Sequence, residues 1–557
     1  GEKAFLTLVD TLLNNNLDVS MTKRGDILGV HYLRADTSTH VSEPAERIKD
    51  LTSVPSPYLT GLLDSFFDGR LMPVLTTNRG CPFTCTFCSE GMSYYSKVNK
   101  SNVERIQKET DYIGNKVNQI AKKFVRRDVY ISDSNFGMYK EDIETAKALC
   151  ATKEKYNWPE YIQATTGKNH KSRILKVAEM LDGGMRLCGS VQSLDTNVQK
   201  NIRRTNIRAD ELMETALEAR KSGANSYSEV ILGLPGDSLT AHEATLEKVI
   251  NAGYDFISPW QFVMLPDTEA ASSETRETYG FVTKWRVLTK SYGNYALGKG
   301  QYLSAAEIEE VCVSQNDFPF DDYLKARTLH LIISIFYNDQ MLSGFLRVID
   351  MLGIARYDWV KNIYANIGFN SSLSSVIGNF VRETKEELWD DVRELEVFIK
   401  KRENVEKFVN GELAANILAK YRIIAVANHM EEICTIAREA TVDLLRKENL
   451  LADEYEKFLN ELSLFEQEKK RGFISSDIAD NEEKFSFDII EFIEGNNTKA
   501  ITNYKLNTPK TVQFKRSQEV ANQIEKNNEI FGTSPAGIYK QLTRTPIKRL
   551  YRIATYL

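Results

Sequence analysis

Short apolar runs alternate with amphipathic, helix-like stretches between residues 71 and 265, and this alternation restricts the fold more than any other feature of the sequence. Strands that alternate with helices pair in parallel βαβ units. The apolar runs cover residues 71–78, 128–137, 161–167, 185–193, 227–236 and 255–265. Six such units predict an α/β fold in the form of an open or partial (β/α)6 barrel, in which the chemistry lies at the carboxyl ends of the strands.

A cysteine-rich loop follows the first of these runs directly. The stretch "RGCPFTCTFCSEG" (79–91) places Cys81, Cys85 and Cys88 with the spacing C-x3-C-x2-C. The chain has 7 cysteines in 557 residues, which is too sparse for a disulfide scaffold. The other four are scattered along the chain, as Cys150, Cys188, Cys312 and Cys434. This distribution indicates a reducing compartment and one thiolate site.

Three thiolates without a nearby histidine favour an iron–sulfur cluster over zinc. Structural zinc normally takes four protein ligands, so these cysteines would leave it one ligand short. The same three residues suit a [4Fe-4S] cluster in which one iron stays open for another ligand. Phe83 and Phe87, between the cysteines, would shield such a cluster from water. A zinc site and a redox dithiol remain the alternatives.

The loop and the ends of the later runs resemble the radical S-adenosylmethionine enzymes, and the resemblance covers roughly residues 54–268. It rests on the cysteine loop, "ISDSNFG" (131–137), "GSVQS" (189–193), "GLPG" (233–236) and "LPDT" (265–268). It implies a TIM-like partial barrel whose open iron is chelated by the amino and carboxylate groups of S-adenosylmethionine. Cluster reduction would then cleave the sulfonium and release a 5′-deoxyadenosyl radical.

The same resemblance implies roles for individual residues. Cys81, Cys85 and Cys88 would be the catalytic cluster ligands, and Arg204 would pair with the methionine carboxylate. The residues expected to bind the cofactor are Phe87, Asp133, Gln192, Ser193, Arg204 and Glu229. A planar guanidinium suits a bidentate carboxylate contact. A carboxylate such as Glu229, if it faces into an apolar barrel, needs a partner or a proton.

The first 70 residues resemble the linker of cobalamin-dependent members of that superfamily. The matching stretches are "GEKAFLTLVDTLL", "GDILGVHYLR" and "ERIKDLTSVPSPY". In those enzymes a cobalamin-binding domain precedes this linker, so we expect such a domain upstream of Gly1. The open mouth of the barrel should then face it.

Beyond the barrel the pattern becomes mainly helical. We expect a linker over 1–70, the barrel over 71–280, a helical region over 281–470 that includes 309–353, and a small α/β extension over 471–557. The stretches 485–495 and 510–516 read as late strands, and "IKRLYRIATY" (547–556) reads as an amphipathic packing helix. We expect this C-terminal half to determine substrate specificity.

The composition limits the partners. Hydrophobic residues make up 42% of the chain and its formal net charge is −6, which is typical of a globular protein and gives no general attraction to nucleic acid or to an anionic membrane. No apolar run approaches the roughly 20 residues that span a bilayer. We therefore expect a cytoplasmic protein with no nucleic-acid or membrane partner.

The leading functional hypothesis is cobalamin-dependent C-methylation of an unactivated carbon, which is implied by the resemblance. Its substrate would be a small molecule or natural product, and a flavodoxin or ferredoxin would supply electrons. The alternatives are a cobalamin-linked radical cyclase or rearrangement enzyme without methyl transfer, and a non-catalytic iron–sulfur protein. The motifs at the strand ends argue against the last, because a structural cluster needs no cofactor pocket.

Overall fold

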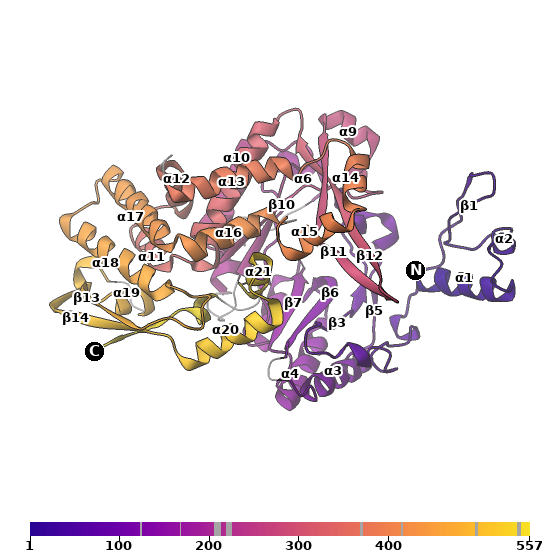
Figure 1. Cartoon of the computed structure of the whole chain (residues 1–557), viewed down its shortest axis with the longest axis horizontal. Helices are drawn as coiled ribbons and strands as arrows, with labels where there is room; N and C mark the ends of the chain where they lie inside the picture. Colours follow the sequence, from indigo (N-terminus) through magenta and orange to yellow (C-terminus); the bar gives the residue numbers. More distant parts are fainter. Residues whose placement is uncertain are drawn as a thin grey trace.

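We describe the fold from a computed structural model of the chain (Figure 1). The structure describes residues 1–122, 125–167, 169–204, 213–218, 226–367, 371–413, 416–495, 499–542 and 547–557.

The alternating pattern forms a half-barrel of parallel strands with helices on its outer side. The strands are β3 (Val74–Leu75), β6 (Asp128–Phe136), β7 (Tyr161–Thr166), β8 (Leu187–Cys188), β9 (Ser226–Leu232) and β10 (Phe256–Gln261). The helices between them include α3 (Val103–Asn118), α4 (Asp142–Tyr156), α5 (Lys171–Met180), α6 (Thr196–Asn201) and α8 (Leu239–Asn251). Asn102 and Ser238 cap the first turns of α3 and α8 through their side chains, as expected for N-cap residues. The sequence prediction of these strands is confirmed.

The strands follow one another in chain order around an open barrel. In the described residues β3, β6 and β7 form one sheet, β8, β9 and β10 form another, and the Ile162–Met185 bridge joins them. Ser258 of β10 pairs with Glu229 of β9. The barrel does not close, because the far edge of β10 continues into an antiparallel contact between Val263 and Val311 instead of returning to β3.

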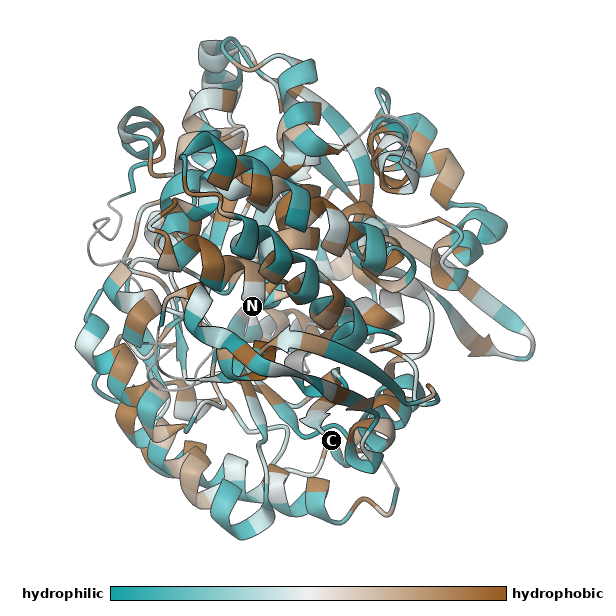
Figure 2. Cartoon of the chain, turned by 90° about the vertical axis from the view of Figure 1, so that its left-hand side faces the viewer, coloured by the Kyte–Doolittle hydropathy of each residue, from teal (hydrophilic) through white to brown (hydrophobic). Residues whose placement is uncertain are grey.

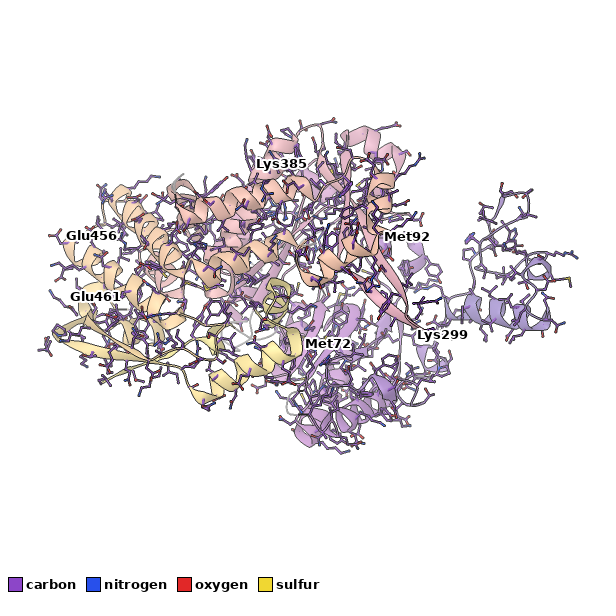
Figure 3. All side chains as sticks on the ribbon, in the orientation of Figure 1. Met72, Met92, Lys299, Lys385, Glu456 and Glu461 are labelled. Atoms are coloured by element: carbon purple, nitrogen blue, oxygen red, sulfur yellow. The ribbon has the colours of Figure 1, made fainter. Side chains whose placement is uncertain are left out.

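Residue Val311 belongs to a long hairpin, and here the sequence prediction is wrong. We expected helix through this region, but β11 (Val282–Gly298) and β12 (Gln301–Ser314) form an antiparallel pair. The strands turn at Gly298, Lys299 and Gly300, which all have positive φ. Figure 3 labels Lys299 at the end of this hairpin. The first helix after the hairpin is α10 (Phe320–Ile332).

The region after the hairpin is mainly helical, as expected. Its helices are α11 (Ser343–Met351), α12 (Arg356–Asn366), α13 (Ser372–Glu386), α14 (Val392–Ile399), α15 (Arg402–Asn410), α16 (Ile417–Asn428), α17 (Met430–Lys447) and α18 (Asp453–Lys470). Many helices carry hydrophobic residues on one side and hydrophilic residues on the other (Figure 2). The hydrophobic residues of the helical region share one core with residues of the half-barrel. One hydrophobic core runs from Val230 and Leu246 of the barrel to Trp359 and Phe465 of the helical region.

The last residues form an α/β unit. It contains β13 (Asn481–Phe487), α19 (Ile489–Glu494), β14 (Lys505–Lys515), α20 (Gln518–Phe531), α21 (Pro535–Leu542) and β15 (Ile553–Tyr556). The sequence placed strands at 485–495 and 510–516, and each overlaps a strand, although α19 replaces the second half of the first. The packing helix expected over 547–556 is wrong, because β15 pairs with β14 there.

An N-terminal segment extends away from the rest of the molecule (Figure 1). It holds α1 (Glu2–Asn14), α2 (Val19–Thr22) and a short hairpin of β1 (Tyr32–Leu33) and β2 (Thr39–His40). Helix α1 buries none of its side chains. Among the described residues, no helix is both long and apolar enough to cross a membrane.

Candidate active site

The cysteine loop leaves the carboxyl end of β3, where barrel active sites lie. Two glycines shape it. Gly80 has a φ of +118°, and a Cβ there would lie 2.6 Å from the Lys97 carbonyl oxygen. At Gly91 a Cβ would lie 2.1 Å from the Cys85 carbonyl oxygen, so the chain after the last cysteine can pack here only as glycine. These glycines explain the "RG" before the first cysteine and the "SEG" after the last.

Asp133, near the end of β6, binds the two residues that precede the cysteine loop, Thr77 and Asn78. Its carboxylate accepts hydrogen bonds from the Thr77 backbone at 2.8 Å, the Asn78 backbone at 3.2 Å and Asn78 Nδ2 at 2.7 Å, and it also accepts one from the Thr77 hydroxyl. Burial raises the pKa of Asp133 to about 6. The sequence predicted this residue as a cofactor contact. The observed bonds engage both carboxylate oxygens and fix the start of the loop against β6, and Asp133 also lines the cavity beside the cysteines.

Two side chains contact the cysteine sulfurs. Asn135 Nδ2 lies 3.4 Å from Cys81 Sγ, and an Arg204 guanidinium nitrogen lies 3.9 Å from Cys85 Sγ. The same guanidinium donates to the Ser190 carbonyl oxygen. Burial, and then the nearby Glu90, Cys85 and Cys81, raise the pKa of the Cys88 thiol, while burial lowers the pKa of Arg204. A buried arginine beside sulfur is suited to stabilise negative charge there.

The loop forms one wall of a cavity of about 340 Å³. The predicted site residues that line it are Cys81, Cys85, Phe87, Cys88, Asp133, Gln192, Arg204 and Glu229. Ser193 is the exception, since it lies outside the lining and its hydroxyl accepts a hydrogen bond from the Asp195 backbone. Ser193, the second residue of the "QS" pair, therefore lies in the turn before α6 and does not line the cavity.

Gln192 has two properties that point to a ligand. Its φ is +64°, an uncommon conformation for a residue other than glycine, and backbone hydrogen bonds to Glu229 and Ile231 hold it there. Its Oε1 is buried at the cavity and has no hydrogen-bond partner among the described residues. A strained backbone and an unsatisfied buried oxygen are costly, and such features concentrate at functional sites.

Hydrogen bonds connect Cys188, Ser190 and Glu229, three side chains that line the cavity. Ser190 Oγ lies 2.7 Å from Cys188 Sγ and donates to Glu229 Oε2 at 2.5 Å. Burial, with Glu229 nearby, raises the pKa of the Cys188 thiol to about 12, so this thiol is neutral near pH 7. Ser190 and Asn135 were absent from the predicted site. Ser190 could have been found from its strand alternation with Gln192, and Asn135 from its place beside Asp133.

The residues present fit an iron–sulfur cluster and an S-adenosylmethionine molecule. The three thiols share one loop beside a cavity that offers a buried guanidinium, a carboxylate and an unsatisfied amide oxygen. The guanidinium suits the carboxylate of such a ligand, and the protein carboxylate suits its ammonium group and hydroxyls. The amide oxygen suits its N–H donors. Among the described residues, no three histidine, cysteine or acidic side chains converge closely enough to bind a single metal ion.

Comparison with known proteins places the cysteine loop inside a recognised family region. Residues 75–249 match the model described as the Radical SAM superfamily. The cobalamin-dependent radical SAM methyltransferase TokK of Streptomyces tokunonensis is 28% identical over 373 residues, which cover 64% of this chain and 51% of that protein. A 2-(S-pantetheinyl)-carbapenam-3-carboxylate methyltransferase of Streptantibioticus cattleyicolor is 28% identical over 293 residues, which cover 51% of this chain and 41% of that protein.

The chain thus spans about half the length of the curated relatives it matches. A solved structure of the cobalamin-dependent S-adenosylmethionine radical enzyme OxsB with aqua-cobalamin bound aligns with a TM-score of 0.41 and 14% identity, covering 83% of this chain and 66% of that chain.

Proposed function

Because the chain belongs to the radical S-adenosylmethionine superfamily, we propose that it is an enzyme that cleaves S-adenosylmethionine reductively and methylates an unactivated carbon of a small molecule with the help of cobalamin. The observation that carries this proposal is the cavity in which the three loop cysteines meet Arg204, Gln192 and Glu229. The names of the two methyltransferase relatives support methyl transfer over cyclisation.

Each residue has a defined task in this proposal. Cys81, Cys85 and Cys88 would hold a [4Fe-4S] cluster, which when bound supplies the electron for cleavage, while cobalamin supplies the methyl group. Arg204 binds the methionine carboxylate beside Cys85. Glu229, oriented by Ser190, accepts a hydrogen bond from the ligand's ammonium or ribose hydroxyls.

Three further residues complete the binding site. Gln192 accepts a hydrogen bond from the ligand through its unsatisfied Oε1. Phe87, which lines the cavity, helps to exclude water from a reactive radical. Asp133, which lines the same cavity and fixes the loop, would also contact the cofactor.

The partners and the organisation of the chain follow from the same proposal. A cobalamin-binding domain would be supplied upstream, a flavodoxin or ferredoxin would deliver electrons, and the protein would act in the cytoplasm on a small molecule or natural product. The division into a linker (1–70), a barrel (71–280), a helical region (281–470) and an α/β extension (471–557) is also part of the proposal.

The ratio of two products tests the reaction. Each methylation needs one hydrogen abstraction, which yields 5′-deoxyadenosine, and one methyl group, which yields S-adenosylhomocysteine when cobalamin is remethylated. With the complete protein, anaerobically reconstituted and reduced, we expect the two products in roughly equal amounts with the methylated product. A mass-spectrometric survey of a substrate library supplies the product mass.

Cysteine variants provide the control for this test. Cys85→Ala should abolish 5′-deoxyadenosine and the methylated product together, since without an assembled cluster no radical forms. Cys150→Ala, on α4 and outside the cavity lining, should keep both. Deoxyadenosine alone, with no gain of a methyl mass, would reject methylation and favour the cyclase.

A further inference from the structure

A second cavity lies along the open edge of the half-barrel. It has a volume of about 360 Å³ and lies among β10, the β11–β12 hairpin, α10 and α16. Phe256, Trp260 and Leu418 contribute apolar surface to its lining, and Trp260 is 55% exposed. Ser258, another lining residue, pairs with Glu229, which lines the cavity beside the cysteines. Since paired residues of neighbouring parallel strands point to the same face, Ser258 and Glu229 connect the linings of the two cavities.

Arg327 of α10 lines this cavity and is only 3% exposed. No hydrogen bond or ion pair joins its guanidinium to any of the described residues, and its Nε is buried without a partner. Its guanidinium carbon lies over the Phe380 ring, 5.5 Å from the ring centroid. Burial lowers the pKa of Arg327. A guanidinium so deeply buried and without an acceptor is costly to fold, unless a ligand supplies the acceptor.

The two carboxylates of the cavity are already engaged by another arginine. Arg286 donates to Glu309 at 2.7 Å and to Glu387 at 3.3 Å, and it also donates to Gln261 Oε1 at 3.0 Å. Glu387 lies near enough to Arg327 to act on its charge but does not form an ion pair with it. The lining therefore holds two carboxylates that pair with Arg286, and Arg327, which has no acceptor among the described residues.

The helix that carries Arg327 becomes irregular at its C-terminal end, where it also lines the cavity. Helix α10 continues into a π-helical turn over Ile333–Tyr337, and both Ser334 in this turn and Asn338 after it line the cavity. Such π turns are rare and recur at functional sites. The distortion and the unpaired arginine thus occur on one wall.

We propose that this cavity binds the anionic end of the enzyme's substrate, a carboxylate or phosphate monoester on a largely apolar body, with Arg327 as the residue that recognises the anion. The assignment of the ligand as the substrate rests on the proposed function. The guanidinium would form the two parallel hydrogen bonds that carboxylates and phosphates accept. Trp260 and Phe256 would contact the apolar body, which would reach past Ser258 towards the cavity beside the cysteines.

Binding of small probes to the iron-free chain tests the anion site without radical chemistry. The probes are 3-phenylpropionate, phenyl phosphate and the neutral 3-phenylpropionamide, titrated by calorimetry. We expect saturable binding of at least one anion and at least tenfold weaker binding of the amide, since a charge-assisted pair is lost. The tighter of the two anions identifies the recognised group.

Variants of one helix separate recognition from folding. Arg327→Met should weaken anion binding at least tenfold, while the ligand-free protein keeps or raises its Tm because an unpaired buried charge is gone. Arg327→Gln, which keeps a polar group, should also lose binding. Lys325→Met is the matched control, since it removes a charge of the same helix that pairs with Asp322 at the surface, and it should bind like the wild type.

Equal anion binding by the wild type and Arg327→Met would overturn the proposal, as would the absence of saturable binding by either anion. A large fall in Tm in both Arg327 variants would also overturn it, because it would show that the guanidinium already has a structural partner. A negative result in the reaction test leaves these measurements readable, because they require neither cluster nor S-adenosylmethionine.

Discussion

At the scale of single residues, Gly91 controls whether the cysteine loop can form. Any side chain there would collide with the Cys85 carbonyl, since a Cβ would lie 2.1 Å from that oxygen. We expect Gly91→Ala to lower iron loading after reconstitution from about four irons per chain to well below one, because the loop must shift at a ligand. Iron analysis and the visible absorption spectrum measure this.

Gly378 supplies the matched control. It lies within α13, and a Cβ there would meet no atom within 4 Å. Gly378→Ala should keep full iron loading and stabilise the protein by about 0.5–1 kcal/mol, as glycine is a poor helix former. Wild-type iron content in Gly91→Ala would show that the loop can relax around the added methyl group.

The sequence could identify those site residues that stand in local motifs. The three cysteines, Gln192, Arg204 and Glu229 line one cavity because their spacing and strand phase place them there. Ser193 follows Gln192 in the chain, but the positive φ at Gln192 turns the chain, and Ser193 lies outside the cavity lining. Arg327 could not be found, because its lack of a partner depends on where Glu309 and Glu387 lie.

At the scale of elements, local patterns identified the strands of the half-barrel but not the strands that pair over long distances. The six apolar runs are rich in apolar and β-branched residues and most of their positions are buried or half-buried, so their sequence resembles that of strands. The β11–β12 hairpin is partly exposed and carries many polar residues, which hid its alternation, although Gly298 and Gly300 marked the turn. β15 forms because it pairs with β14, and the local pattern of hydrophobic residues does not predict this pairing.

Helices α8 and α10 are joined by a buried histidine pair that makes stability depend on pH. His242 Nε2 lies 2.7 Å from His330 Nε2, and Asp237 lies 3.8 Å from His242 Nδ1. Burial raises the pKa of Asp237 to about 7, lowers the pKa of His242 to about 3, and, with His242 and Arg327 nearby, lowers the pKa of His330 well below its usual value. All three groups are therefore neutral in the folded protein near pH 5.

The direction of this pH dependence between about pH 4 and 6.5 follows from the number of protons that the unfolded and folded states bind. The unfolded chain binds protons on both histidines and none on Asp237, whereas the folded protein binds one on Asp237. The unfolded state thus holds one more proton, and stability contributed by this group rises with pH by about 1.4 kcal/mol per unit. Taken alone, the stability that Asp237 contributes is lost as the pH rises towards 7, because its raised pKa favours the protonated form in the folded protein. The stability that the neutral histidines contribute is lost as the pH falls below 6.5, because the unfolded chain then binds protons on them.

Two variants test this count. Asp237→Asn removes the proton of the folded state and should steepen the slope to about 2.7 kcal/mol per pH unit, while His242→Gln removes a proton of the unfolded state and should flatten it. Urea unfolding at several pH values gives the slopes. The same slope in both variants and the wild type would contradict the proposed protonation states.

At the scale of the whole molecule, burial is distributed unevenly between the two ends of the chain. The hydrophobic core that begins on the barrel extends through the C-terminal helices to Leu550 and Tyr551. The N-terminal segment has no buried side chain in α1, and its Thr22 and Ser42 hydroxyls bond within the segment. In Figure 1 the segment projects from one end of the molecule. In Figure 3, Glu456 and Glu461 of α18 mark the other end.

We therefore expect a short deletion at the C-terminus to destabilise the protein more than a long deletion at the N-terminus. Deleting residues 1–45 removes the exposed Glu2–Arg79 ion pair, and such pairs are worth about 0–1 kcal/mol. Deleting 549–557 removes β15 together with Leu550, Tyr551 and Arg552, which are 1%, 8% and 1% exposed. Burial of the first two alone contributes about 4 kcal/mol.

The loss of Arg552 adds to this cost. Arg552 donates to the Phe514 carbonyl at 2.6 Å and pairs with the buried Glu468 at 3.4 Å, so its removal leaves a buried carboxylate with a weaker partner. Urea unfolding of both truncated chains, followed by circular dichroism, measures the difference. We expect the N-terminal deletion to stay within about 1 kcal/mol of the intact chain and the C-terminal deletion to lose more than about 4 kcal/mol. Equal losses would mean that the N-terminal segment contributes to the core through contacts other than those described, and would refute the uneven distribution of burial.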